Sequence, residues 1–134
     1  MPHFHWIAIL VAGLIGFLIG GIWYGPLFGK AWMAARGITK ADTAGMNMPL
    51  IFGTTFLLNL FSALMLDHLY FTYDAPVGLH HSLVIAGIIA VGFIIPSMGV
   101  NYLFSRLSRG LFLIDAGYWL VVYLLMGAIF GLLV

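Results

Sequence analysis

Four long apolar runs, separated by polar segments, dominate the hydrophobic pattern of this chain. A helix needs about 20 apolar residues to cross the hydrocarbon core of a bilayer, and each run reaches that length. The pattern therefore predicts transmembrane helices over residues 4–25, 49–72, 81–104 and 111–134. The second and third polar segments are tight, so the helices that they join must run antiparallel. We expect an all-α integral membrane four-helix bundle.

The first polar segment is the longest and contains an amphipathic stretch. Its apolar residues share one side of a helix, while Lys30 and Arg36 can reach lipid headgroups. This arrangement predicts a short interfacial helix over residues 27–36. Thr39 and Asp42 follow with the spacing of a capping box, which predicts a further helical turn before the second run.

The composition supports a membrane protein and excludes several other classes. Of all residues, 63% are hydrophobic and 7% are charged, whereas roughly a quarter are charged in a typical soluble domain. We therefore expect a single transmembrane domain over residues 1–134. The first run has neither the basic start nor the cleavage site of a signal peptide. The absence of cysteine excludes disulfides and zinc–thiolate sites. A net charge of +1 does not favour nucleic-acid binding, and no cofactor is indicated.

All basic residues lie in two of the three segments between the runs. They are Lys30, Arg36, Lys40, Arg106 and Arg109. Lys and Arg are enriched in cytoplasmic loops of membrane proteins. The pattern therefore predicts that segments 26–48 and 105–110 are cytoplasmic and that both termini lie outside. The expected location is the bacterial cytoplasmic (inner) membrane.

Small residues at helical spacing mark packing faces in the first and last runs. Lipid supplies no hydrophobic drive between helices, so close approach depends on such residues. The glycines concerned are Gly13, Gly16, Gly20, Gly117, Gly127 and Gly131. These faces are expected to pack the helices of one bundle. Alternatively, one face forms the seam of a homo-oligomer, for which a dimer is favoured.

Polar side chains within the runs are costly in lipid and are therefore candidates for function. Asp115 lies near the inner end of the fourth run. It is expected to form either a structural ion pair or hydrogen-bonded tie, or a cation or proton site open to the cytoplasm. Asn59, near the bilayer centre, forms either an interhelical hydrogen bond or part of a solute path. The candidate path consists of Asn59, Ser62, Ser97, Asn101, Asp115 and Tyr118.

A second polar group is expected at the outer ends of the runs. Its weak candidates for metal binding are Asp67, His68, His80 and His81, with His3, His5 and Asp74 nearby. Imidazole and carboxylate suit zinc, nickel, copper or iron, and histidine titrates near neutral pH. The spacing matches no metal motif, because adjacent residues point about 100° apart on a helix. Ordinary interfacial polarity is the main interpretation, with metal binding and proton sensing as alternatives.

Pro96 interrupts the third run. Proline removes one backbone hydrogen bond, and its ring clashes with the carbonyl of Gly92. Ser97 can satisfy the freed group. We therefore expect a kink at this point.

The stretch Trp-Tyr-Gly-Pro-Leu-Phe-Gly-Lys, from Trp23 to Lys30, resembles the signature of a family of small bacterial integral membrane proteins of unknown function. The stretches that begin at Asn101 and at Asp115 also resemble that family. The resemblance implies four membrane spans and brings no activity. It also implies asparagine at the position of Asp115 in many relatives, which weakens any mechanism that requires a charge at this position.

Three functions remain open from the sequence. The first is a transporter- or channel-like protein for a small solute or cation. The second is a structural or accessory scaffold or a lipid-interacting sensor subunit. The third is a membrane-embedded enzyme for a lipophilic substrate, although no triad, phosphate loop or zinc-protease motif is present. The first run carries no charge, which disfavours proton-coupled export of the kind that small four-span multidrug exporters perform.

Overall fold

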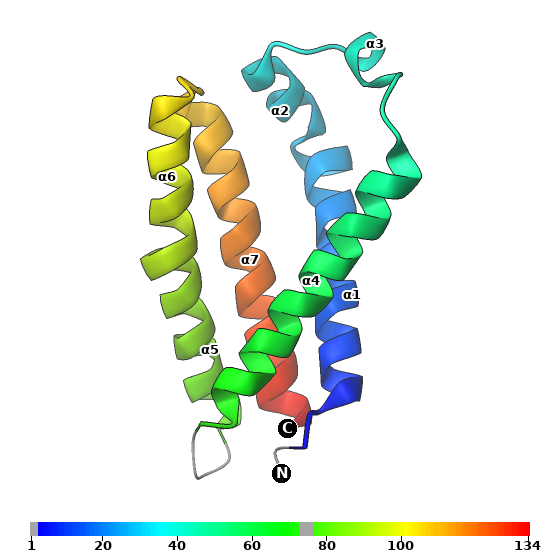
Figure 1. Cartoon of the computed structure of the whole chain (residues 1–134). Coiled ribbons are helices and arrows are strands. Elements are labelled where there is room, and N and C mark those ends of the chain that lie inside the picture. The colour runs from blue at the N-terminus through cyan, green and yellow to red at the C-terminus, as the bar shows by residue number, and fades with distance from the viewer. Residues whose placement is uncertain (1–2, 73–76) are drawn as a thin grey trace.

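The computed structural model describes residues 3–72 and 77–134. All regular structure in these residues is helical, and four helical segments are long and apolar enough to cross a membrane. The predicted all-α four-helix membrane bundle is therefore confirmed. The start of the first helix and the end of the last lie at one end of the bundle, and two short helices cover the other end (Figure 1).

Two of the spanning segments are built from more than one element. In chain order the elements are α1 (Trp6–Ile22), η1 (Trp23–Leu27), α2 (Gly29–Arg36), α3 (Lys40–Thr43), α4 (Met48–Tyr70), α5 (Gly78–Ile89), η2 (Ala90–Ile94), α6 (Ile95–Phe104) and α7 (Arg109–Leu133). Both η1 and η2 are π-helical turns. The short helix α2 begins at Gly29 rather than at residue 27, because η1 extends the first span to Leu27.

Local capping interactions explain where several helices begin and end. The side chain of Asn47 accepts a hydrogen bond from Leu50 N (3.2 Å) at the start of α4, and Ser108 Oγ accepts one from Leu111 N (3.1 Å) in α7. Such caps satisfy donors that the first turn leaves unpaired. The expected capping box is present, since Asp42 Oδ2 accepts a hydrogen bond from Thr39 N at 2.7 Å.

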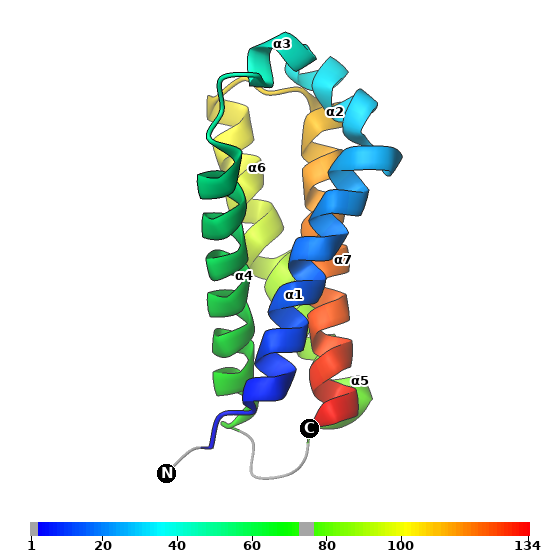
Figure 2. The ribbon, with the colours of Figure 1, turned by 90° about the vertical axis from the view of Figure 1, so that its right-hand side faces the viewer.

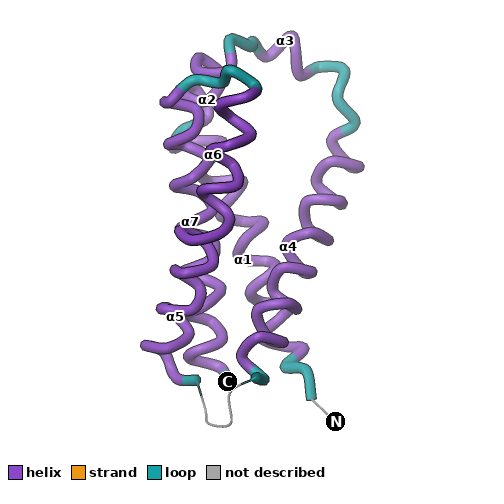
Figure 3. Tube along the Cα trace, turned by 60° about the vertical axis from the view of Figure 1, so that its left-hand side comes forward, coloured by secondary structure: helices purple, strands orange, loops and turns teal. Residues whose placement is uncertain are grey.

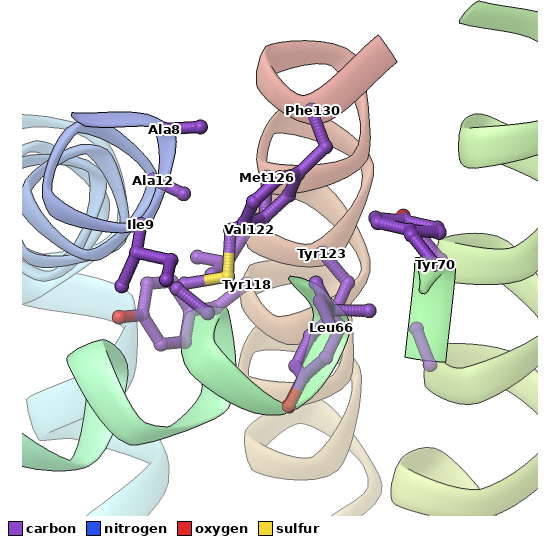
Figure 4. Packing of buried hydrophobic residues seen from close by; sticks show 13 residues of the cluster. Ala8, Ile9, Ala12, Leu66, Tyr70, Tyr118, Val122, Tyr123, Met126 and Phe130 are labelled. Atoms are coloured by element: carbon purple, nitrogen blue, oxygen red, sulfur yellow. The ribbon is translucent and has the colours of Figure 1, made fainter. Parts of the chain in front are cut away.

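Helix α7 lies at the centre of the bundle. It packs against α1 on one side and α5 on another, while α4 packs mainly against α1; Figure 2 shows α1 beside α7. Val122, Met126 and Phe130 of α7 form the core with residues of α1 and α4 (Figure 4). At the end that carries α2 and α3, helix α4 leans away from α6 and α7 (Figures 1 and 3).

The glycines of the predicted packing faces contact other helices of the same chain. A Cβ atom built on Gly127 would lie 2.9 Å from the carbonyl oxygen of Ser82, and one on Gly131 would lie 2.6 Å from the Cα of Leu79. The other four face side chains of α4, α7 or η1; these glycines are Gly13, Gly16, Gly20 and Gly117. The close approach of the backbones at Gly127 and Gly131 holds α7 against α5. A homodimer stays a prediction.

The irregularity expected at Pro96 takes the form of a π-helical turn. This turn, η2, directly precedes α6, in which Pro96 occupies the first turn. A π-helical turn pairs backbone groups five residues apart instead of four. The regular α-helical hydrogen bonds are therefore interrupted next to Pro96, which has no N–H to donate. Ser97 Oγ donates to Phe93 O at 2.5 Å, so the serine binds this carbonyl rather than that of Gly92.

Replacing Gly127 by alanine tests the contact between α5 and α7. We expect Gly127→Ala to lower the free energy of unfolding by about 1–3 kcal/mol, since the new methyl group would overlap the backbone of Ser82. Gly53→Ala is the matched control, because a Cβ there meets nothing within 4 Å, and it should gain up to about 1 kcal/mol from helix propensity. Thermal unfolding in detergent measures both; equal effects would contradict this packing.

Candidate functional site

Asp115 of α7 is a carboxylate held between two tyrosines at the α2–α3 end of the bundle. Its side chain is largely buried, with 8% of the residue exposed. Tyr24 of η1 donates its hydroxyl to Oδ1 at 2.5 Å, and Tyr102 of α6 donates its hydroxyl to Oδ2. One carboxylate therefore ties α7 to both the first and the third spans.

No basic side chain among the described residues forms an ion pair with this carboxylate. Among these residues, the one pairing of a carboxylate with a basic or imidazole side chain joins Asp67 to His5 at the opposite end, and Arg36, Arg106 and Arg109 are exposed. Asp115 thus forms the hydrogen-bonded tie rather than an ion pair with the neighbouring arginines. A buried charge without a cation is costly, and two charge-assisted hydrogen bonds offset part of that cost.

The turn η1 positions two adjacent side chains against α7. Phe28 N donates to Trp23 O at 2.8 Å, a bond that spans five residues. Trp23 Nε1 donates to Ile114 O at 2.9 Å, while Tyr24 reaches the next residue, Asp115. Gly29 permits the turn to close, because a Cβ there would lie 2.6 Å from Tyr24 O. The signature-like stretch therefore forms the contact with the carboxylate.

A cavity of about 870 Å³ lies against Asp115, and we call it the polar cavity. Aromatic and charged side chains from η1, α2, α3, α6 and α7 contribute to its walls. They include Tyr24, Trp32, Arg36, Asp42, Tyr102, Asp115, Tyr118 and Trp119. The guanidinium carbon of Arg36 lies 5.5 Å from the ring centroid of Trp32, so this exposed cation already has an aromatic partner.

A second cavity, of about 620 Å³, continues between α1, α4 and α7, and we call it the apolar cavity. Its walls are mostly aliphatic and aromatic, and they include Phe17, Ile51 and Phe52. Thr55 supplies one hydroxyl. The combined volume is enough for a small organic ligand, since typical ligand pockets measure roughly 300–1,000 Å³.

The structure brings three of the predicted path residues together. Asp115 and Tyr118 both line the polar cavity. Tyr118 donates its hydroxyl to Gly16 O at 3.0 Å, and the side chain of Asn59 lies beside Gly16. Asn59 is 2% exposed, and its Nδ2 has no hydrogen-bond partner among the described residues.

The other three predicted path residues lie elsewhere. Ser62 lines a separate pocket of about 180 Å³ with Tyr123. Ser97 and Asn101 are exposed, and Ser97 is hydrogen-bonded to its own helix. Neither lines the polar cavity. A role for these three in a solute path stays a prediction without support from their position.

The weak candidates for metal binding are not gathered by the fold. Asp67 is 1% exposed and accepts hydrogen bonds from His5, at 3.0 Å from its backbone N and 2.8 Å from Nδ1. His68, His80 and His81 are exposed, and Asp74 lies outside the described residues. In the described part of the chain, no group of three or more His, Asp or Glu residues could hold a metal ion.

Sequence reasoning missed Tyr24 and Tyr102 as partners of Asp115. One signal was present, because a buried tyrosine hydroxyl usually needs a hydrogen-bond partner. The sequence analysis named Asn101 as a candidate instead of its neighbour Tyr102. Adjacent residues point in different directions on a helix, and only the tyrosine faces α7.

Comparison with known proteins identifies a family of proteins but no individual relative. No curated protein and no solved structure matches the chain. Residues 7–131 match the family described as "Protein of unknown function (DUF1761)". Since this match covers all four spanning helices almost completely, the chain belongs to that family.

Proposed function

We propose that this membrane protein binds and transports a small organic cation, with Asp115 as the anionic anchor. One observation carries the proposal: a largely buried carboxylate, without a basic partner in the described residues, faces a cavity of about 870 Å³. An unneutralised charge in a medium of low dielectric constant attracts an opposite charge strongly. A bound cation would therefore stabilise this site.

The walls of the polar cavity favour an ammonium group over a metal ion. Aromatic faces attract organic cations through their quadrupoles, and several such rings beside a carboxylate form a typical ammonium site. Tyr24, Tyr118 and Trp119 are available in this way. Calcium, by contrast, takes six to eight oxygen ligands, more than Asp115 and its two tyrosine partners supply. A small alkylammonium ion fits this chemistry best.

The two tyrosines would orient the carboxylate for such a ligand. An ionised carboxylate has about four acceptor positions, and the hydroxyls of Tyr24 and Tyr102 occupy one on each oxygen. The remaining positions can accept hydrogen bonds from an ammonium group or contact a quaternary ammonium ion. Because the hydroxyls come from two different spans, the ligand would also bridge η1, α6 and α7.

Transport would require a change of conformation beyond the cavities. The hydroxyl of Tyr118 on Gly16 O and the close-packed side chains of Val122 and Met126 block the bundle interior below the site. Nδ2 of Asn59, which has no hydrogen-bond partner in the described part of the chain, belongs to a side chain that lies beside Gly16, next to this block. Helix α4 packs mainly on α1 and little on α7, so opening the route would require α1, together with α4, to separate from α7 and to break the hydrogen bond from Tyr118 to Gly16.

The polar cavity would open to the cytoplasm of a bacterium. The basic residues of the chain lie in the segment that holds α2 and α3, in the loop between α6 and α7, and at the first residue of α7. All three places are at the same end of the bundle as the polar cavity (Figure 1). The bias of Lys and Arg toward cytoplasmic loops supports this orientation.

Single cysteines test the orientation, because the chain has none of its own. We expect a membrane-impermeant maleimide to label His3→Cys on intact cells and to label Lys40→Cys only after the membrane is opened. The measurement is the fraction of protein modified before and after lysis. Labelling of Lys40→Cys on intact cells would reverse the orientation.

Tetramethylammonium tests the function. We expect calorimetry in lipid nanodiscs to detect its binding to the wild-type chain and liposomes containing the protein to take it up. Asp115→Asn should weaken binding by about tenfold or more, because it removes the charge, while the bundle stays folded, since an amide can still hydrogen-bond both tyrosines. This expectation agrees with the asparagine that the family resemblance implies.

Asp67→Asn is the matched control for this experiment. It also removes one buried carboxylate, at the end of the bundle away from the polar cavity. Its folded fraction should bind tetramethylammonium like the wild type. Equal affinity of the wild-type and Asp115→Asn proteins would refute Asp115 as the anchor, and binding without uptake would refute transport in favour of an accessory or sensing role.

A further inference from the structure

We infer that the ligand is an amphiphile, whose ammonium head lies at Asp115 and whose apolar tail lies in the apolar cavity between α1, α4 and α7. This inference rests on the proposed cation-binding function and extends it from the head of the ligand to its whole shape. Three features of the described residues support it: the continuity of the two cavities, the change in polarity between them, and their order along the bundle.

The two cavities share part of their walls. Tyr24, Met48, Tyr118 and Trp119 line both of them. A ligand bound at Asp115 therefore reaches the apolar cavity by passing the same side chains. Each cavity alone, of about 870 and 620 Å³, lies within the range of roughly 300–1,000 Å³ that holds small ligands. Their combined volume is larger than a compact cation such as tetramethylammonium would fill.

The two cavities differ in the charged side chains of their walls. The polar cavity has Asp115, Arg36 and Asp42 in its walls. None of the described residues in the walls of the apolar cavity is charged, and Phe17 and Phe52 meet there edge to face, with ring centroids 5.9 Å apart. A charged group in one cavity and an apolar surface in the other match a ligand that has a charged head and an apolar tail.

The order of the cavities also matches the orientation of an amphiphile in one leaflet. The polar cavity lies by the short helices α2 and α3, where Trp32 and Arg36 suit the membrane interface. The apolar cavity extends from Met48 to Thr55 along α4, toward the middle of that helix. Helix α4 leans away from α6 and α7 at this end (Figures 1 and 3). Leu18 of α1 and Phe52 of α4 line the apolar cavity and are exposed on the outside of the bundle, so a tail can enter sideways from the lipid.

Gly21 allows the tail to be tested separately from the head. It lines the apolar cavity but not the polar cavity, and a Cβ built on it meets nothing within 4 Å. Leucine at this position would fill space in the apolar cavity without displacing a neighbouring helix. Gly53 of α4 is the matched control, since it is also exposed, also has no atom within 4 Å of an added Cβ, and lines neither cavity.

The experiment compares tetramethylammonium with n-octyltrimethylammonium, which has the same head and a tail. Their dissociation constants are measured for the wild type, Gly21→Leu, Gly53→Leu and Asp115→Asn in nanodiscs of phosphatidylglycerol, a lipid without an ammonium group. Partition of the octyl probe into the bilayer is the same for every variant, so it cancels when variants are compared. Quenching of tryptophan fluorescence gives a second readout, because Trp119 lines both cavities.

We expect Gly21→Leu to weaken binding of the octyl probe by about tenfold, because the tail loses its contacts in the filled cavity. The same change should leave tetramethylammonium binding unaltered, and Gly53→Leu should alter neither. Asp115→Asn should weaken both probes. Equal binding of the octyl probe by the wild type and Gly21→Leu, with tetramethylammonium still bound, would refute the inference of an amphiphile but not the proposed cation binding. Failure of the wild type to bind tetramethylammonium would overturn the proposed function itself.

A last arm identifies the source of the amphiphile. Replacement of part of the phosphatidylglycerol by phosphatidylethanolamine adds a lipid that carries an ammonium head. Weaker binding of the octyl probe in these discs, abolished by Asp115→Asn, would assign the site to a membrane lipid. Unchanged binding would assign it to a soluble amphiphile, and both results agree with a tailed ammonium ligand.

Discussion

The hydrogen bonds from Tyr24 and Tyr102 to the buried carboxylate of Asp115 are the interaction on which the arrangement of this protein depends. They join the first, third and fourth spans at the end where α4 has separated from α6 and α7. Without them, a charge would lie unsatisfied in an apolar bundle, at a cost of several kcal/mol. The same interaction leaves an anion, with unused acceptor positions, at the wall of a cavity.

Helix α7 makes this arrangement possible because its faces differ. Gly127 and Gly131 let the backbone of α5 approach near one end, while Gly117 receives the ring of Trp23 and Asp115 receives the tyrosines near the other. Packing is therefore closest at the end where α1 begins and α7 ends, and looser at the α2–α3 end. This gradient explains why the two large cavities lie on the side of Tyr118 away from the core of Val122 and Met126.

Much of the fold, and half of the candidate site, could be predicted from the sequence. Run length predicts the spanning helices, and the Thr39–Asp42 spacing predicts a local cap, because both depend on residues close together in the chain. Asp115, Tyr118 and Asn59 stood out since polar groups are rare inside apolar runs. Ser97 and Asn101 were chosen by the same criterion, yet their position depends on the rotation of α6 about its axis, and apolarity on every side of that helix leaves the rotation undefined.

By itself, the sequence determined that the chain forms four apolar helices, since 20 consecutive apolar residues have few other stable states in lipid. Only the tertiary structure decided which side chains meet across the bundle. Tyr24 and Asp115 are 91 residues apart, and their contact requires both the π-helical turn at Pro26 and a close approach of α1 to α7. Such contacts depend on helix rotation and tilt, which packing sets and which no local pattern of residues records.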